Sequence, residues 1–112
     1  MDNARKKDLV REYKEAKQRA GIFAVTCKAS GERWVASTRN LDKAQNPIWF
    51  SLRLGSYINK SAQAAWNAHG AESFSFDELE EVTDDNALII GELLKERDVH
   101  WRKELGAGKL VG

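Results

Sequence analysis

The sequence has little of the chemistry that builds cross-linked, metal-bound or membrane-spanning proteins. Cys27 is the only cysteine, so the chain can form neither an internal disulfide nor a zinc site made of cysteines. No apolar run approaches the roughly 18 residues that a membrane-spanning helix needs. Residues 1–8 carry charges with no apolar stretch behind them, which is unlike a secretory signal. We therefore expect a cytoplasmic protein.

The chain does have the composition of one small folded domain. Its 112 residues are 42% hydrophobic and 31% charged, which is enough for one modest core. The net charge of +1 hides an uneven distribution. Residues 1–20 carry seven basic and four acidic side chains, residues 21–70 carry six and two, and residues 71–112 carry five and eleven. The basic front can attract a polyanion, although solvated helices explain the same charges.

The first part of the chain predicts a helix followed by a β-hairpin. Residues 3–20 are charged with a thin apolar stripe, and Gly21 is a natural helix stop. The runs 22–27 and 33–38 are rich in β-forming residues and flank a turn that contains a glycine. Because side chains alternate along a strand, Phe23, Val25 and Cys27 are expected on one face, with Ile22, Ala24 and Thr26 on the other.

The rest of the chain predicts three helices and one further strand. Asn40 can cap a short turn through Gln45, and Asn46-Pro47 opens a helix that ends at Gly55. Its expected buried side consists of Ile48, Phe50, Leu52 and Leu54. A second helix begins at Asn59 or Ser61 and runs to His69, residues 73–82 alternate as a third strand, and residues 84–86 cap a long helix at 87–105.

This order of elements predicts an α+β fold. We expect a small three-stranded antiparallel sheet, made of the hairpin and the third strand, covered by helices. The N-terminal helix at 1–20 and the long C-terminal helix are additions to this unit. The expected organisation is the helix at 1–20, one domain at 21–105 and a flexible tail at 106–112.

Residues 21–82 resemble the GIY-YIG endonuclease domain. Gly21-Ile22-Phe23 and, after the hairpin turn, Trp34-Val35-Ala36 stand where the two signatures of that family lie. The likeness continues in order through 37–41, 52–60, 62–70, 74–76 and 79–81. Any one fragment is a weak signal, but the ordered set is a specific match for the fold.

The resemblance implies hydrolysis of a phosphodiester bond with one divalent metal ion, Mg²⁺ or Mn²⁺. In such domains the signature tyrosines help to place and activate a water. An arginine on the first helix stabilises charge on the phosphate, a histidine often lies one turn later, and a glutamate holds the metal. The chemistry requires a base for the water and a cation for the developing charge.

This sequence departs from the family at most of those positions. The two tyrosine positions hold Phe23, which has no hydroxyl, and Trp34, which cannot accept a proton. The arginine and histidine positions fall on Ala44 and Ile48. Glu80 remains as the metal ligand, with Glu81 as the alternative if the register differs by one residue. One carboxylate holds magnesium weakly.

Three functions follow from this pattern. The first is a catalytically impaired domain that binds nucleic acid through basic residues, for which the candidates are Arg39, Lys43, Arg53 and Lys60. The second is a protein-interaction or self-association module that uses an apolar patch of Phe23, Trp34, Ile48 and Trp49. The third is an active endonuclease built around Glu80, with Tyr57 offering a hydroxyl. Trp34 either stacks on a base or fills the space of the missing tyrosines, and we favour the second.

Overall fold

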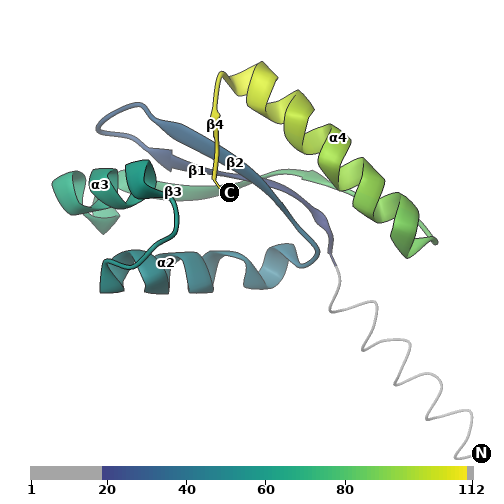
Figure 1. The fold of residues 1–112 in the computed structure, drawn as a ribbon, viewed down its shortest axis with the longest axis horizontal. Helices are drawn as coiled ribbons and strands as arrows, with labels where there is room; N and C mark the ends of the chain where they lie inside the picture. The colour runs from purple at the N-terminus through teal and green to yellow at the C-terminus, as the bar shows by residue number, and fades with distance from the viewer. Residues whose placement is uncertain (1–18, 111–112) are drawn as a thin grey trace, which may run out of the picture.

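The computed structural model describes residues 19–110, which form one mixed sheet covered by helices (Figure 1). The strands are β1 (Gly21–Cys27), β2 (Arg33–Thr38), β3 (Phe74–Glu81) and β4 (Gly108–Lys109), in the order β3-β1-β2-β4. The helices are α2 (Gln45–Leu54), α3 (Lys60–His69) and α4 (Ala87–Leu105), with short 3₁₀ turns η1 (Leu41–Lys43) and η2 (Ala71–Ser73). The expected helix at 3–20 lies almost entirely outside the described residues. None of the described helices has both the length and the apolar character that crossing a membrane requires.

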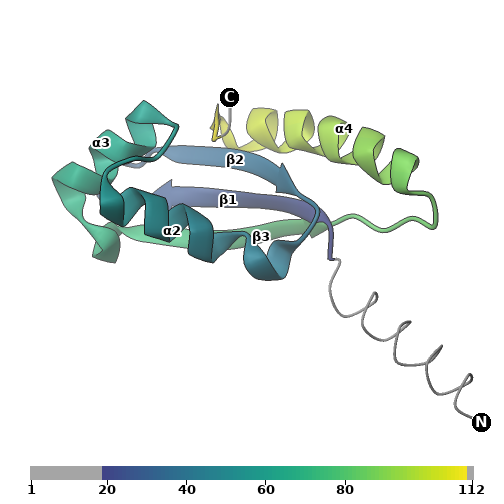
Figure 2. The ribbon, with the colours of Figure 1, turned by 60° about the horizontal axis from the view of Figure 1, so that its bottom comes forward.

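The sheet separates two apolar layers, as the alternation in β1 predicts. Phe23, Val25 and Cys27 face α2 and α3, and we call this side the aromatic face. Ile22 and Ala24 face the opposite way and pack beneath α4, on what we call the α4 face. Figure 2 shows α2 and α3 on one side and α4 on the other. β1 is therefore buried on both faces, which explains its nearly continuous apolar sequence.

The sheet has four strands, so the expected three-stranded antiparallel sheet is wrong in detail. β1 pairs antiparallel with both β2 and β3, as expected, but β4 adds a parallel strand along β2. The sequence favours a flexible tail over residues 106–112. Instead Leu110 is fully buried, and its backbone N–H donates to the carbonyl of Val35 at 3.0 Å. Burial of this one leucine fixes β4 in place. A strand of two residues is too short to show an alternating pattern in the sequence.

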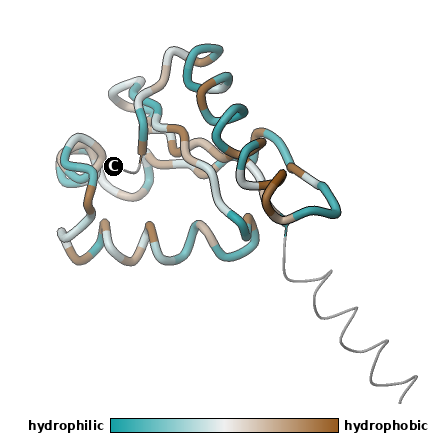
Figure 3. The backbone as a smooth tube through the Cα atoms, turned by 45° about the vertical axis from the view of Figure 1, so that its right-hand side comes forward, coloured by the Kyte–Doolittle hydropathy of each residue, from teal (hydrophilic) through white to brown (hydrophobic). Residues whose placement is uncertain are grey.

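The helix ends agree with the expected capping residues at α3 and α4. The side chain of Asn59 accepts from the N–H of Ala62 at the start of α3, and that of Asn86 accepts from Leu88 at the start of α4. Gly106 takes a left-handed conformation at the end of α4, which glycine adopts without strain. In Figure 3 the turns of α2 and α4 alternate between hydrophilic and hydrophobic, as helices with one buried side do.

The start and the buried side of α2 differ from the expectation. The helix begins at Gln45, which places Pro47 inside its first turn rather than at its first position. Leu52 is buried and Ile48 is half-buried, but Phe50 and Leu54 are 61% and 65% exposed. Trp49, not Phe50, turns toward the aromatic face and packs on the core. The expected burial of Phe50 and Leu54 is therefore wrong, because one step along a helix rotates a side chain by about 100°.

A β-bulge interrupts the pairing of β1 with β3 beside Gly21. Phe23 lies opposite Glu78 and Ile22 lies opposite Glu80, which leaves Leu79 as an extra residue on β3. A Cβ atom on Gly21 would lie 2.2 Å from the backbone oxygen of Glu80, far inside van der Waals contact. Only glycine fits where the first strand passes so close to the bulged one.

Candidate functional site

The four substituted family positions lie together on the aromatic face. Phe23 and Trp34 belong to its buried cluster, and Ala44 and Ile48 pack against that cluster from the start of α2. Phe23 is 3% exposed, and its ring stacks on that of Phe76 with centroids 4.8 Å apart. The fold therefore brings these positions together as the resemblance implies, but the side chains there fill the space with apolar atoms.

Trp34 is engaged through both its ring and its nitrogen. The side chain is 4% exposed, and its ring lies parallel to Phe74 with centroids 6.1 Å apart. Its indole N–H donates to Ser61 Oγ at 2.9 Å, and Ser61 in turn donates to Asn59 Oδ1 at 2.8 Å. Asn59 Nδ2 donates to the carbonyls of Lys109 and Leu110, so the chain of bonds reaches β4. A ring in this position has no open side for a base.

The apolar patch expected for protein interaction is not a surface patch. Phe23 and Trp34 are buried, and Ile48 and Trp49 are half-buried against the core. Trp49 makes edge contacts with Trp66, with ring centroids 5.8 Å apart. These residues form the interior between α2, α3 and the sheet, so they offer little area to a partner.

Tyr57, the residue expected to offer a hydroxyl in an active endonuclease, has a partly covered phenol. Its side chain is half-buried against the aromatic face, in the segment that joins α2 and α3. Burial raises the pKa of its phenol above the ordinary value, so the hydroxyl stays protonated at neutral pH. Its backbone N–H is held by Gln63 Oε1 at 2.9 Å, which fixes this segment against α3.

Glu80 lies on the opposite side of the sheet from Phe23 and Trp34. One of its oxygens, Oε1, accepts from Arg97 Nε at 2.7 Å and from Trp101 Nε1 at 2.9 Å, both on α4. Burial alone would raise the pKa of this carboxyl, but the hydrogen bonds from Trp101 and Arg97 outweigh it and lower the pKa. The structure therefore does not bring Glu80 to the substituted positions of the aromatic face.

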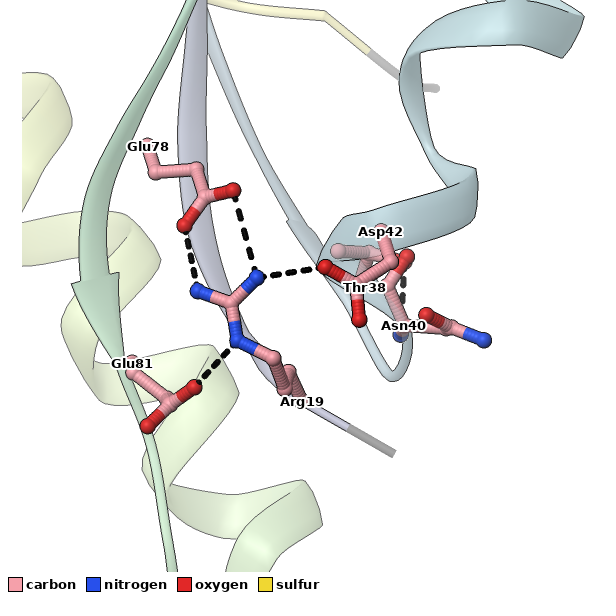
Figure 4. A network of polar contacts seen from close by, with 6 residues as sticks. All are labelled: Arg19, Thr38, Asn40, Asp42, Glu78 and Glu81. Carbon is pink, nitrogen blue, oxygen red and sulfur yellow. Dashed lines mark hydrogen bonds and ion pairs between the residues drawn. The ribbon is translucent and has the colours of Figure 1, made fainter. Parts of the chain in front are cut away.

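Glu81, the alternative ligand, belongs to a second network that centres on Arg19 (Figure 4). The Arg19 guanidinium donates to Glu78 at 2.6 Å, to Glu81 at 2.7 Å and to Asp42 at 2.5 Å. Hydrogen bonds to Glu78, Glu81 and Asp42 raise the pKa of Arg19 above its ordinary value. The network connects the start of β1 with η1 and with the end of β3. These carboxylates are already compensated by a cation of the chain itself.

Asp98 is a buried carboxylate that is not among the candidates predicted from the sequence. It is 9% exposed, which makes it the one buried acid among residues 19–110, and its Oδ1 accepts from Arg102 Nε at 2.9 Å. It follows the buried Leu94 by one helical turn. Leu94, Asp98 and Arg102 follow one another at a spacing of four residues, and this pattern could have indicated that Asp98 is buried and paired.

The four basic candidates for nucleic-acid contact come from different elements. Arg39 follows β2 and reaches α4, where its guanidinium would lie 3.0 Å from a Cβ on Gly91. Lys43 lies in η1, Arg53 in the last turn of α2, and Lys60 at the first position of α3. All four are exposed, and none of them forms an ion pair with another residue of 19–110.

The described residues offer a poor set of donors for a divalent metal ion. Within 19–110, no three side chains among histidine, cysteine, aspartate and glutamate come together in a way that suits a metal. Glu80 and Glu81 both accept from arginines, at 2.7 Å each. A carboxylate that is already paired with a guanidinium has lost part of the charge that binds a cation.

The fold is similar to that of a known endonuclease domain. The catalytic domain of the homing endonuclease I-TevI superposes with a TM-score of 0.67 at 26% identity, over 79% of this chain and 89% of that one. A variant of the intron endonuclease I-TevI catalytic domain, with one glutamate replaced by alanine, gives 0.67 at 25% identity, over 79% and 84%. No protein-family model matches the chain, and no curated protein matches it. The similarity confirms the expected GIY-YIG-like nuclease fold.

Proposed function

We propose that this chain, which has a GIY-YIG-like nuclease fold, binds nucleic acid and has severely impaired nuclease chemistry. One observation carries the proposal. At the positions where the family resemblance implies catalytic tyrosines, Phe23 and Trp34 are 3% and 4% exposed inside a packed cluster. A water cannot be placed and activated where the space is filled by stacked rings.

The chemical case rests on the same cluster. Phe23 has no hydroxyl, and the one polar atom of Trp34 already donates to Ser61. Ala44 carries no cation for the phosphate charge, and Ile48 carries no imidazole. Loss of one electrostatic stabiliser typically lowers a rate by about 10²–10³-fold, and several are absent together here.

A role for Mg²⁺ or Mn²⁺ at Glu80 receives little support from its surroundings. Arg97 and Trp101 both donate to the same oxygen of Glu80, and the side chain lies on the α4 face. A metal ion there would compete with a guanidinium 2.7 Å away.

Nucleic-acid binding is supported by exposed cations that the fold leaves uncompensated. Arg39, Lys43, Arg53 and Lys60 make no ion pairs within the described part of the chain. Three acidic side chains near the start of β1, in contrast, are partly neutralised, because Asp42, Glu78 and Glu81 share Arg19. Cations that hold no internal partner remain available for phosphates, and such binding weakens steeply with salt.

The experiment is a binding isotherm on duplex and branched DNA over a range of salt concentrations. We expect the wild type to bind with an affinity that falls as salt rises, and the charge reversal Arg39→Glu with Arg53→Glu to abolish binding. The matched control is Lys95→Glu with Lys103→Glu, which removes equal charge from exposed positions on α4. Absence of wild-type binding, or equal loss in both variants, would contradict the proposal.

A second candidate function is self-association through the outer side of α2. Phe50 and Leu54 on α2 are 61% and 65% exposed, and Ile58, in the segment after the helix, is 70% exposed. Sedimentation at increasing concentration tests this function. Association that resists salt and disappears in Phe50→Ser with Leu54→Ser would favour it, whereas a monomer at all concentrations would exclude it.

A further inference from the structure

The α4 face carries a hollow that none of the candidate sites above includes. It has a volume of about 490 Å³ and lies where α4 ends at Leu105, beside the turn that joins β1 and β2. Thr26, Lys28 and Arg33 line it from the hairpin, and Ser75 and Asp77 line it from β3. We call it the hairpin hollow. Its volume is in the range that holds a nucleotide-sized group.

The register of the sheet explains why this part of the α4 face is open. Ala24 pairs with Val35 on one side, and these two apolar residues pack beneath α4, whereas Asp77 lies opposite Ala24 on β3. The next row on the same face consists of Arg33, Thr26 and Ser75, paired across three adjacent strands. This row is polar throughout, so the helix gains nothing by covering it. With strands about 4.8 Å apart, the row presents a strip roughly 10 Å wide.

The charged groups of the hairpin hollow favour an anion on its hairpin side. Neither Lys28 nor Arg33 forms an ion pair with another residue in 19–110. Thr26, which pairs with Arg33 across the hairpin, also lines the hollow, and its hydroxyl can donate a hydrogen bond. Asp77 lies on the β3 side, where Ser75 Oγ donates to its Oδ2 at 3.4 Å. A phosphate is therefore attracted to Lys28 and Arg33 and repelled from the β3 side.

A second hollow continues the first one past Arg33. It has a volume of about 480 Å³ and shares Arg33 and Leu105 with the hairpin hollow. Gly31, Gly106 and Gly108 line it together with Glu32 and Trp34, and space is open where a Cβ would stand on Gly31 or Gly106. The two hollows form a track with Arg33 at its middle and with backbone accessible along one side. An extended chain can follow such a track, and comparison of a single strand with a duplex tests this assignment.

We propose that this track binds the sugar–phosphate backbone of single-stranded nucleic acid, with Arg33 and Lys28 as the phosphate contacts. This inference rests on the proposed function and assigns it a second surface. The hairpin hollow lies on the α4 face, and the second hollow extends from it to Trp34 and Ser61. Leu79 and Leu105 give the hairpin hollow an apolar wall for sugars. Asp77 can accept from the amino groups of bases, whose edges then lie on the β3 side.

The test is fluorescence anisotropy with a labelled 12-nucleotide single strand, as DNA and as RNA, at several salt concentrations. In Lys28→Gln with Arg33→Gln, the slope of log affinity against log salt is expected to fall by about 1.4, since each phosphate contact on a single strand contributes about 0.7. At 0.1 M salt this corresponds to a loss of affinity of roughly tenfold or more. The control Lys95→Gln with Lys103→Gln is expected to change affinity less than about twofold, because it removes the same charge from α4.

The outcomes separate this inference from the proposed function. One outcome is that Lys28→Gln with Arg33→Gln leaves binding intact, whereas Arg39→Glu with Arg53→Glu removes it. That outcome would overturn the track and leave the proposed function standing. Equal affinity for a duplex of the same sequence would overturn the single-strand assignment. No salt-dependent binding to any nucleic acid would contradict both. Circular dichroism of each variant, with the single change Arg33→Gln as a second test, excludes a folding defect.

Discussion

The substitution Gly21→Ala tests how the first signature segment is built into the sheet. An added Cβ would lie 2.2 Å from the backbone oxygen of Glu80 and 2.7 Å from Leu41 Cδ1. The leucine side chain can rotate away, but the oxygen belongs to β3 at its bulge. Relief of the contact requires a shift of roughly 1 Å in one of two paired strands, and such overpacking typically costs about 1–3 kcal/mol.

Additional bonds are expected to weaken with that shift. Gly21 lies opposite Glu81, and the side chain of the adjacent Glu80 accepts hydrogen bonds from Arg97 and Trp101. Each hydrogen bond that is lost contributes about 1 kcal/mol, so we expect Gly21→Ala to lower the free energy of unfolding by about 3 kcal/mol. For a domain of this size, the midpoint of thermal unfolding should fall by about 10 °C or more.

Urea unfolding followed by tryptophan fluorescence measures the effect, with Gly108→Ala as the matched control. A Cβ on Gly108 would lie 3.5 Å from Trp34 Cδ1, which is ordinary contact. The control is expected to stay within about 0.5 kcal/mol of the wild type, since an alanine also restricts the unfolded chain. If Gly21→Ala were as stable as Gly108→Ala, the close passage of β1 and β3 would be refuted.

Three further predictions test the packing and the charges. Phe23→Tyr should lose about 1–3 kcal/mol of stability in urea and gain no nuclease activity, because its hydroxyl would be buried without a partner; unchanged stability would contradict this. Leu110→Ala should cost about 2–5 kcal/mol in the same assay, whereas a mobile tail would tolerate it. The pKa of Glu80 is lowered in the fold, so its contribution to stability is present above the unfolded pKa of about 4.3 and is lost as the pH falls through the lower folded value. The free energy of unfolding, measured between pH 3 and 6, should therefore depend less on pH in Glu80→Gln than in the wild type. An equal dependence would contradict this.

The helices and the first three strands could be predicted because their signals are local. Asn59 and Asn86 stand at the starts of α3 and α4, and Gly70 and Gly106 stand just past their ends. Alternation in β1 likewise predicted the two faces of the sheet. These signals depend on backbone chemistry and on side-chain period, both of which can be read within a few residues.

The position of Glu80 could not be predicted from period alone. In a regular strand Glu78 and Glu80 would follow Phe74 and Phe76 onto the aromatic face. The bulge at Leu79 adds one residue, and a shift of one residue moves the following side chain to the other face. The bulge has a tertiary cause, because it lies where β3 passes close to Gly21. No residue within β3 predicts it.

The remaining differences have the same kind of origin. β4 consists of two residues and is held by Leu110, whose burial depends on a cavity built by distant elements. The hairpin hollow depends on where α4 ends relative to the polar row of Arg33, Thr26 and Ser75. The sequence predicted α4 and the hairpin, but not how far α4 extends over the hairpin.

A cleavage assay tests the central claim most directly, namely that the packed aromatic face does not support phosphodiester hydrolysis. Supercoiled plasmid and branched DNA are incubated with Mg²⁺ or Mn²⁺ and with wild type, Glu80→Ala or Asp98→Asn. We predict no cutting by the wild type, or equal cutting by all three proteins, which would indicate a contaminant. Cutting by the wild type that either substitution abolishes would contradict the claim and would mean that a carboxylate outside the aromatic face supports catalysis.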